Sequence, residues 1–257
     1  MIIKKIINWK IFWALFTAGM FGVITIFPFL LTTQGNVLRE LPIPLSVVLF
    51  FSTVQSAVLI GVAIFVGLRL GKKIGFGAPL ISSWLSGEPV REKLKSVAKV
   101  SIKLGILSGV LIIGSDYIFN LFIEPISTVG TPLWQGFLAS FYGGVVEEIL
   151  LRLFLVTLLV WIMWKFSKPE NIKPPTTAIW IAIISASVIF GLGHLPATAL
   201  LTTITPVIII RAVLLNGIGG VIFGWLYWKK GFVSAIIAHF TTDIILLVIF
   251  PLLLTLS

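Results

Sequence analysis

Residues 133–164, LWQGFLASFYGGVVEEILLRLFLVTLLVWIMW, form a long apolar run that contains three charged residues, Glu147, Glu148 and Arg152. A helix needs about 20 apolar residues to cross a hydrocarbon layer of about 30 Å. The run is long enough, and it therefore predicts a membrane-spanning helix. A charge at mid-bilayer costs at least about 2.5 kcal/mol on insertion scales, so these three side chains have to pair, face the protein interior or act chemically.

The rest of the chain is equally apolar. Of its 257 residues, 58% are hydrophobic and only 11% are charged, and the mean hydropathy is +1.13. A soluble core could not hide so much apolar surface. Seven runs are long enough to span a membrane: 11–32, 45–68, 97–123, 133–164, 177–196, 206–228 and 232–256. The first follows MIIKKIINWK, is too long for a signal-peptide core and has no cleavage pattern, so we expect it to be retained.

Uniformly apolar runs of this length favour helices over barrel strands, because a helix satisfies all its backbone polar groups internally. The sequence predicts an all-α polytopic membrane protein, a single domain over residues 1–257 formed by a bundle of about seven, or eight, transmembrane helices. Its first expected partner is the lipid bilayer. The chain has no cysteine, which excludes a thiol nucleophile and a thiolate metal site.

The net charge of +10 does not form a surface for nucleic acid, because basic residues alternate with the spans. They lie before the first span and in the second, fourth and sixth loops: Lys4, Lys5, Lys10, Arg69, Lys72, Lys73, Arg91, Lys93, Lys95, Lys165, Lys168, Lys173, Lys229 and Lys230. The other loops hold only Arg39, Glu40 and Glu124. This asymmetry predicts a cytoplasmic N-terminus and an outside C-terminus. It also places the amphipathic segment 74–96 along the cytoplasmic surface and the Pro-rich break 167–177 on the same side.

Ionisable residues inside the spans are few, and helical geometry sorts them. Glu148 and Arg152 are one turn apart and can pair, whereas Glu147 points about 100° away. One turn also separates His239 from Asp243 in HFTTD, and Phe190 from His194 in FGLGH. Four other polar residues at this depth match no motif, namely Asp116, Asn120, Arg211 and Asn216. We expect them to pack against other helices or to line a cavity, and Arg211 and Asn216 are also candidates for substrate contact.

A carboxylate, two imidazoles and a second carboxylate form a set that can activate water. The carboxylate can take a proton from water, while histidine can donate a proton or stabilise an oxyanion. The set therefore indicates hydrolysis. Glu147, His194 and His239 would also suit a zinc ion with an open position, although no HExxH helix is present. From the residues, the cofactor stays open: none, or zinc.

Three motifs occur in order on late spans: EEILLR fits EExxxR, FGLGH fits FxxxH, and HFTTD fits HxxxN/D. In this combination the chain resembles the type II CAAX prenyl endopeptidase and bacteriocin-processing (CPBP) family of intramembrane proteases, over about residues 133–245. The resemblance implies an intramembrane endopeptidase that acts on a membrane-associated peptide or protein tail. It is greater to the bacterial members, which are linked to bacteriocin maturation and self-immunity, and so implies a prokaryotic cytoplasmic membrane.

Carried over by position, the resemblance implies that Glu147 is the general base and that His194 assists water activation. His239 and Asp243 would stabilise the oxyanion or orient the scissile carbonyl, with Asp243 standing where many relatives have Asn. Glu148, Arg152 and Phe190 would support them. Relatives have been described both as metalloproteases and as metal-independent glutamate proteases, so the resemblance leaves the cofactor open.

Two other classes fit the same residues: a catalytically silent immunity or binding protein of this fold, and an ion-coupled transporter. The transporter is disfavoured because the two halves of the chain contain no matching pair of interrupted helices. A single site also sets a geometric condition. Straight helices at about 1.5 Å per residue place His194 and His239 at different depths. Either span five starts later than residue 177 and continues past Pro196 with a kink, or the helices tilt strongly.

Overall fold

A computed structural model describes residues 7–124, 130–167 and 173–256 of the chain. Within these ranges every regular element is a helix, which confirms the all-α prediction. The basic residues Lys4, Lys5 and Lys168 and part of the predicted break 167–177 lie outside the described residues.

The chain begins with α1 and reaches α6 through one long helix and three short ones, with these bounds: α1 Trp9–Thr25, α2 Phe27–Thr33, α3 Gly35–Glu40, α4 Leu45–Ile74, α5 Pro79–Leu85 and α6 Arg91–Phe119. The second part contains three π-helical segments, labelled η: α7 Leu133–Phe141, η1 Tyr142–Glu147, η2 Ile149–Val156, α8 Thr157–Phe166, α9 Thr176–Gly193, α10 Leu195–Ala199, α11 Pro206–Lys230, α12 Phe232–Ile244, η3 Ile245–Ile249 and α13 Phe250–Leu256.

Six helical stretches of the described chain are long and apolar enough to cross a membrane: Trp9–Thr33, Leu45–Ile74, Arg91–Phe119, Thr176–Ala199, Pro206–Lys230 and Phe232–Leu256. Each corresponds to one predicted span. The remaining predicted span, 133–164, is helical without a break from Leu133 to Phe166 but changes from α to π geometry in its middle. The protein is therefore an integral membrane protein, with six such apolar spans in the described residues where the sequence predicted about seven.

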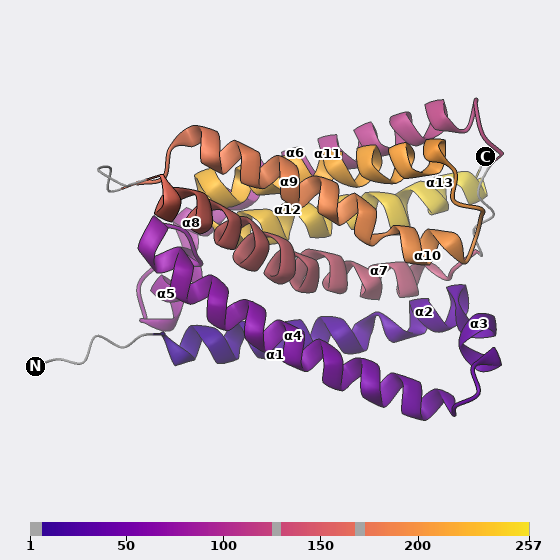
Figure 1. Ribbon diagram of the computed structural model, residues 1–257, viewed down its shortest axis with the longest axis horizontal. Helices are drawn as coiled ribbons and strands as arrows, with labels where there is room; N and C mark the ends of the chain where they lie inside the picture. The colour runs from indigo at the N-terminus through magenta and orange to yellow at the C-terminus, as the bar shows by residue number, and fades with distance from the viewer. Residues whose placement is uncertain (1–6, 125–129, 168–172, 257) are drawn as a thin grey trace, which may run out of the picture.

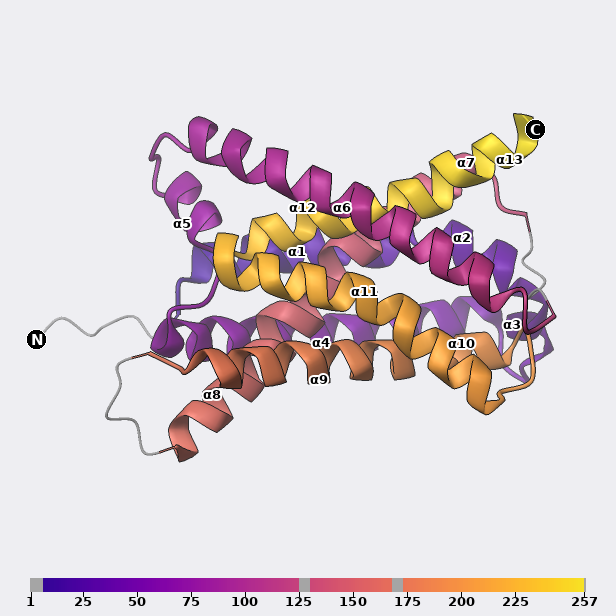
Figure 2. The ribbon, with the colours of Figure 1, turned by 90° about the horizontal axis from the view of Figure 1, so that it is seen from above.

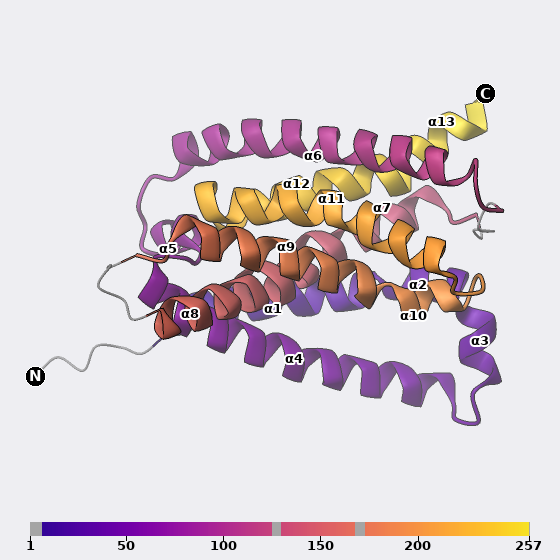
Figure 3. The same ribbon diagram turned by 45° about the horizontal axis from the view of Figure 1, so that its top comes forward.

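The helices run along the long axis of the molecule, so that their ends gather at two opposite ends (Figure 1). The short helix α5 and the end of α8 lie at one of them, together with the start of α6 (Figure 3). Lys72 and Lys73 in the last turn of α4, Lys165 in that of α8, and Lys229 in that of α11 lie there too. We call this the basic end. The elements α2, α3, α10 and α13 lie at the opposite end.

The helices approach each other closely at small residues. This is usual in membranes, where the hydrophobic effect does not drive helices together and close packing has to do so. A Cβ added at Gly220 of α11 would collide with Ser187 of α9, and one added at Gly144 would lie 2.9 Å from Cβ of Phe240 in α12. Large apolar side chains meanwhile cover the outside; Phe50 and Phe51 on α4 are each 63% exposed. Such a surface suits contact with lipid.

Seen from above, α6 crosses the α12–α13 helix, and the two diverge toward the end opposite the basic end (Figure 2). The fifth span starts at Thr176, so the expectation that it starts later than residue 177 was wrong, but it does continue past Pro196. The span breaks at His194 and continues as α10, with Pro196 in its first turn, to Ala199. His194 therefore lies inside the span rather than at its outer end.

Candidate active site

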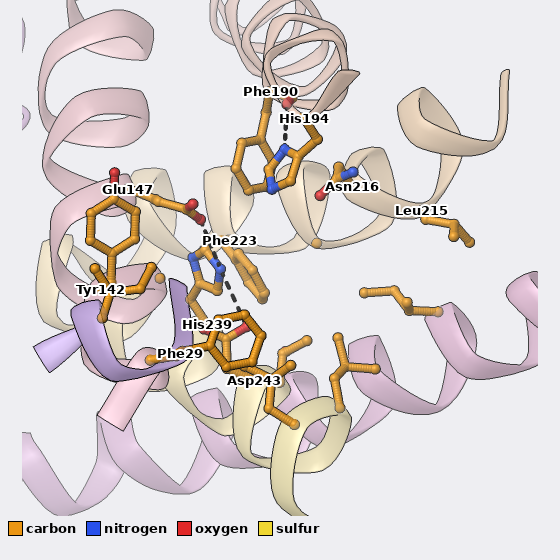
Figure 4. A pocket seen from close by; sticks show the side chains of 18 residues that line it. Phe29, Tyr142, Glu147, Phe190, His194, Leu215, Asn216, Phe223, His239 and Asp243 are labelled. Atoms are coloured by element: carbon orange, nitrogen blue, oxygen red, sulfur yellow. Dashed lines mark hydrogen bonds and ion pairs between the residues drawn. The ribbon is translucent and has the colours of Figure 1, made fainter. Parts of the chain in front are cut away.

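A cavity of ≈ 330 Å³ lies among the helices α2, α6, α7, α9, α11 and α12 (Figure 4). It is lined by Ile26, Phe29, Ile112, Ala139, Tyr142, Gly143, Glu147, Phe190, His194, Leu215, Asn216, Gly219, Phe223, His239, Thr242, Asp243, Leu246 and Leu247. The four residues predicted to be catalytic, Glu147, His194, His239 and Asp243, are all among them. Polar side chains therefore meet at one place in an otherwise apolar bundle.

The two consecutive glutamates occupy different environments, as the helical spacing predicted. Glu147 ends η1 and lines the cavity, with 21% of its side chain exposed. Glu148 is fully buried beneath it and forms an ion pair with Arg152, 2.8 Å from Glu148 Oε1 to Arg152 Nη1. Arg152 also donates from Nη2 to the Gly220 carbonyl of α11 at 3.2 Å. The hydrogen bond from Arg152 thus ties η2 to α11.

His239 is held from below by Glu148. Its Nδ1 lies 2.7 Å from Glu148 Oε1, and because a carboxylate oxygen accepts, the ring nitrogen is the donor. The opposite nitrogen, Nε2, lies 3.5 Å from Glu147 Oε2 and 3.7 Å from Asp243 Oδ1. A histidine whose Nδ1–H is engaged by a carboxylate has a fixed ring orientation and a defined tautomer. Nε2 is therefore the nitrogen that His239 offers to the cavity.

Stacked side chains further fix the His239 ring. Phe223 of α11 lies almost parallel to it, with ring centroids 4.7 Å apart and planes at 25°. The Arg152 guanidinium lies on the Phe223 ring, 5.3 Å from its centroid. Phe223 thus forms part of the floor of the cavity, a role that the sequence did not indicate because an apolar Phe in an apolar span carries no distinguishing signal.

His194 is oriented by the end of its own helix. Its Nδ1 donates to the Phe190 carbonyl at 2.9 Å, which satisfies a carbonyl in the last turn of α9 and leaves Nε2 directed at the cavity (Figure 4). The Phe190 ring makes edge contacts with both imidazoles, at centroid distances of 4.7 Å to His194 and 6.1 Å to His239. Phe190 thus contacts both histidines.

Two further polar residues line the cavity. Asn216 of α11 donates from Nδ2 to the Ala212 carbonyl at 2.9 Å, and its Oδ1 is left toward the cavity (Figure 4). Tyr142 was not among the predicted residues. It is five positions before Glu147, and the i→i+5 hydrogen bonding of a π-helix brings such a pair to one face, whereas regular α-helical periodicity does not. The residues Asp116 and Arg211 lie outside the lining and pair with each other, 2.6 Å between Oδ1 and Nη2.

The zinc alternative requires Glu147, His194 and His239 to surround one point. In the part of the chain that the structure describes, no group of three or more His, Cys, Asp or Glu side chains could hold a metal ion. Glu147 Oε2 lies 3.5 Å from His239 Nε2, while the Nδ1 of His194 is bound to the Phe190 carbonyl. The side-chain positions therefore do not fit the three-ligand site.

Comparison with curated proteins and with solved structures gave no match. Residues 129–245 match the model of one protein family, described as type II CAAX prenyl endopeptidase Rce1-like. The matched range begins just before α7 and ends at the start of η3, so it includes the four predicted catalytic residues and the Glu148–Arg152 pair. Over these residues the chain is similar to the type II CAAX prenyl endopeptidase Rce1-like family, as the order of its three motifs predicted.

Proposed function

We propose that the protein is an intramembrane endopeptidase that hydrolyses a peptide bond in a membrane-associated peptide or protein tail. The proposal rests on the positions of three residues that line one cavity. His239 Nε2 lies 3.5 Å from Glu147 Oε2 and 3.7 Å from Asp243 Oδ1. The family match supports the same class of reaction. A carboxylate with only a structural role would be fully buried against a partner, as Glu148 is. The Glu147 side chain is instead 21% exposed and faces the cavity.

In the proposed reaction a water molecule lies between Glu147 and Nε2 of His194. The water oxygen attacks the scissile carbonyl carbon while one of its protons passes to the Glu147 carboxylate, as in general base catalysis. Because the Nδ1–H of His194 is donated to the Phe190 carbonyl, Nε2 of the neutral ring can accept a hydrogen bond from the same water and orient it.

The tetrahedral intermediate carries an oxyanion that needs hydrogen-bond donors. His239 supplies one from Nε2–H when its ring is doubly protonated, with Glu148 accepting from Nδ1–H. An ionised Asp243 would repel the oxyanion and would compete for the single Nε2–H proton, 3.7 Å away, so Asp243 acts in its protonated form. The proton on Glu147 then passes to the leaving nitrogen as the C–N bond breaks.

The test is hydrolysis of a fluorogenic peptide library by the detergent-purified protein and its Glu147→Gln variant. Loss of a general base lowers the rate by about 10²–10⁴-fold, while the near-isosteric amide should leave the fold intact. Glu40→Gln, on the exposed helix α3, is the matched control and should keep full activity. Equal activity in Glu147→Gln and the wild type would remove Glu147 as the base.

A catalytically silent binding protein of the same family predicts a different result. Neither the wild type nor Glu147→Gln would then cleave any peptide, and both would bind a peptide from the library with the same affinity. Measurement of peptide binding beside hydrolysis therefore separates the two functions. Repeating the hydrolysis assay with a chelator tests the metal requirement independently of the side-chain geometry.

We also propose that the basic end faces the cytoplasm. Described basic residues gather there, at the ends of α4, α8 and α11 and along the first turns of α6, whereas the opposite end has Arg39 with Glu40 and Glu124. Retention of lysine and arginine on the cytoplasmic side is the strongest determinant of membrane topology. The N-terminus would then be cytoplasmic, and the end with α2, α3, α10 and α13 would lie outside.

A further inference from the structure

We propose that Asn216 binds the backbone of the substrate peptide next to the scissile bond and holds that bond at Glu147. Cleavage of the peptide rests on the proposed function; binding of its backbone by Asn216 does not. Three features point to this role: the position of Asn216 in the cavity, the hydrogen bonds of its amide group, and the needs of a peptide backbone in an apolar site.

Asn216 lies on the face of α11 that lines the cavity. The other lining residues of this helix are apolar or glycine, so Asn216 is the one α11 residue of the lining with a hydrogen-bonding side chain. In the view of Figure 4, His194 lies between Glu147 and Asn216. A peptide whose scissile bond lies at the water between Glu147 and His194 would then have a neighbouring peptide group beside Asn216.

The Asn216 amide is held by its own helix. Its Nδ2 donates to the Ala212 carbonyl at 2.9 Å, and within the described part of the chain this is its only side-chain hydrogen bond. An asparagine in a membrane helix usually hydrogen-bonds to a neighbouring helix, but this one contributes no such bond to the packing of α11. Its Oδ1 and its second Nδ2–H therefore stay available, and Oδ1 faces the cavity.

A peptide brings backbone N–H and C=O groups into the cavity, and each weakens binding when it is buried without a partner. Most polar residues of the lining are already engaged. Four serve the proposed reaction, and the Thr242 hydroxyl donates to backbone carbonyls of α6 and α12 at 2.9 and 3.0 Å. Tyr142 lies on the Glu147 side of the cavity (Figure 4). On the His194 side, Asn216 is therefore the group that can accept from the peptide N–H through Oδ1.

Asn216→Leu tests this role, because leucine has a similar size but no polar side-chain atom. The helix should stay folded, since the Ala212 carbonyl keeps its backbone hydrogen bond within α11, and the thermal unfolding temperature should stay close to that of the wild type. We expect Asn216→Leu to lower kcat/KM for a fluorogenic peptide about 10- to 100-fold, because a buried peptide group loses its partner. Leu214→Ala, at a 42% exposed position of the same helix, is the control and should leave kcat/KM unchanged.

Ester replacement in the peptide backbone separates substrate binding from an effect on the fold. On either side of the scissile bond, one amide N–H at a time is replaced by oxygen, which removes a donor without changing the side chains. At the position bound by Asn216, the ester should lower kcat/KM of the wild type about 10-fold or more and leave that of Asn216→Leu unchanged, because the partner is already absent. Additive effects of Asn216→Leu and every ester would overturn the proposal, as would equal kcat/KM of Asn216→Leu and the wild type.

Binding is measured separately in the Glu147→Gln background, where the same peptides and esters stay intact. Addition of Asn216→Leu should raise the Kd of the peptide about 10- to 100-fold and abolish the effect of the same ester. If this is found but the wild type cleaves no peptide, the proposed function fails while the role of Asn216 stands. If the wild type cleaves and Asn216→Leu changes neither binding nor cleavage, the role of Asn216 fails while the function stands. A protein that neither binds nor cleaves any peptide would overturn both.

Discussion

One oxygen of Glu148 serves two partners, since Oε1 pairs with Arg152 at 2.8 Å and accepts from His239 Nδ1 at 2.7 Å. The sequence predicted the first contact, because both residues lie on one helix at a spacing of four. The second contact joins η2 to α12 across 91 positions of the chain. Spacing within a helix carries no information about such a contact, so the role of Glu148 in orienting His239 emerged only from the fold.

Two roles of Glu148 can be separated by mutation. Glu148→Gln leaves the Arg152 charge buried without a counter-charge, and breaking a buried pair in this way costs about 3–5 kcal/mol. Glu148→Leu combined with Arg152→Leu removes both charges, and the thermal unfolding temperature in detergent should return close to that of the wild type. Hydrolysis should stay reduced by about 10²–10⁴-fold, because the His239 Nδ1–H has lost its acceptor. Recovery of hydrolysis together with stability would show that Glu148 has no positioning role.

Gly143 sets the distance between η1 and the catalytic face of α12. A Cβ added there would collide with Asp243 Oδ2 and lie 3.2 Å from His239 Nε2. We expect Gly143→Ala to reduce hydrolysis strongly and to destabilise the protein by about 1–3 kcal/mol, the usual cost of overpacking. Gly217→Ala on α11 is the control, because its Cβ meets nothing within 4 Å. A fully active Gly143→Ala would show that Asp243 can move without loss of function. Peptide hydrolysis and thermal unfolding measure both effects.

At the scale of the helices, the sequence predicted the existence of the spans and the resemblance of residues 133–245 to one family, and both are confirmed. Apolar length and motif order are local properties, which a sequence displays directly. The change from α to π geometry between Tyr142 and Val156 was not predicted, because the apolar residues around Glu147 fit either geometry. The continuation of the fifth span past Pro196 was one of two predicted alternatives, because a proline after an apolar run indicates a kink but not whether the helix resumes.

The Asp116–Arg211 ion pair joins α6 to α11. It lies one helical turn from Ile112 and Leu215, which line the cavity. Arg211 Nε donates to Asp116 Oδ1 at 2.7 Å. The Arg211 side chain is 18% exposed and the Asp116 side chain 33%. Asp116→Leu or Arg211→Leu leaves one charge without its partner at membrane depth, and each should lower the thermal unfolding temperature. The double variant should recover part of the loss, with a coupling energy of about 0.5–3 kcal/mol. Simple additivity of the two single effects would show that the pair does not stabilise the α6–α11 contact.

For the whole molecule, the charge distribution predicts which ends of the helices share a side of the membrane. A reporter enzyme that folds only outside the cytoplasm should be active when fused after Leu256 and inactive when fused after Lys230. A reporter that is active only in the cytoplasm should give the opposite pattern. Activity of the outside reporter after Lys230 would reverse the proposed orientation. The sequence alone could assign the charges to loops, but only the packed bundle relates the cavity to those loops.

The closed floor beneath His239 has a consequence for turnover. Glu148 and Arg152, buried beneath His239, leave no route for a peptide on that side, so both products leave past the apolar side chains that line the cavity. The fragment whose side chains contact those apolar residues is the more tightly held of the two. We therefore expect product release to limit the rate on strongly apolar peptides, and the tightly held fragment to inhibit competitively. Efficient substrates would then be those whose apolar contacts are sufficient for entry but weak enough for rapid departure.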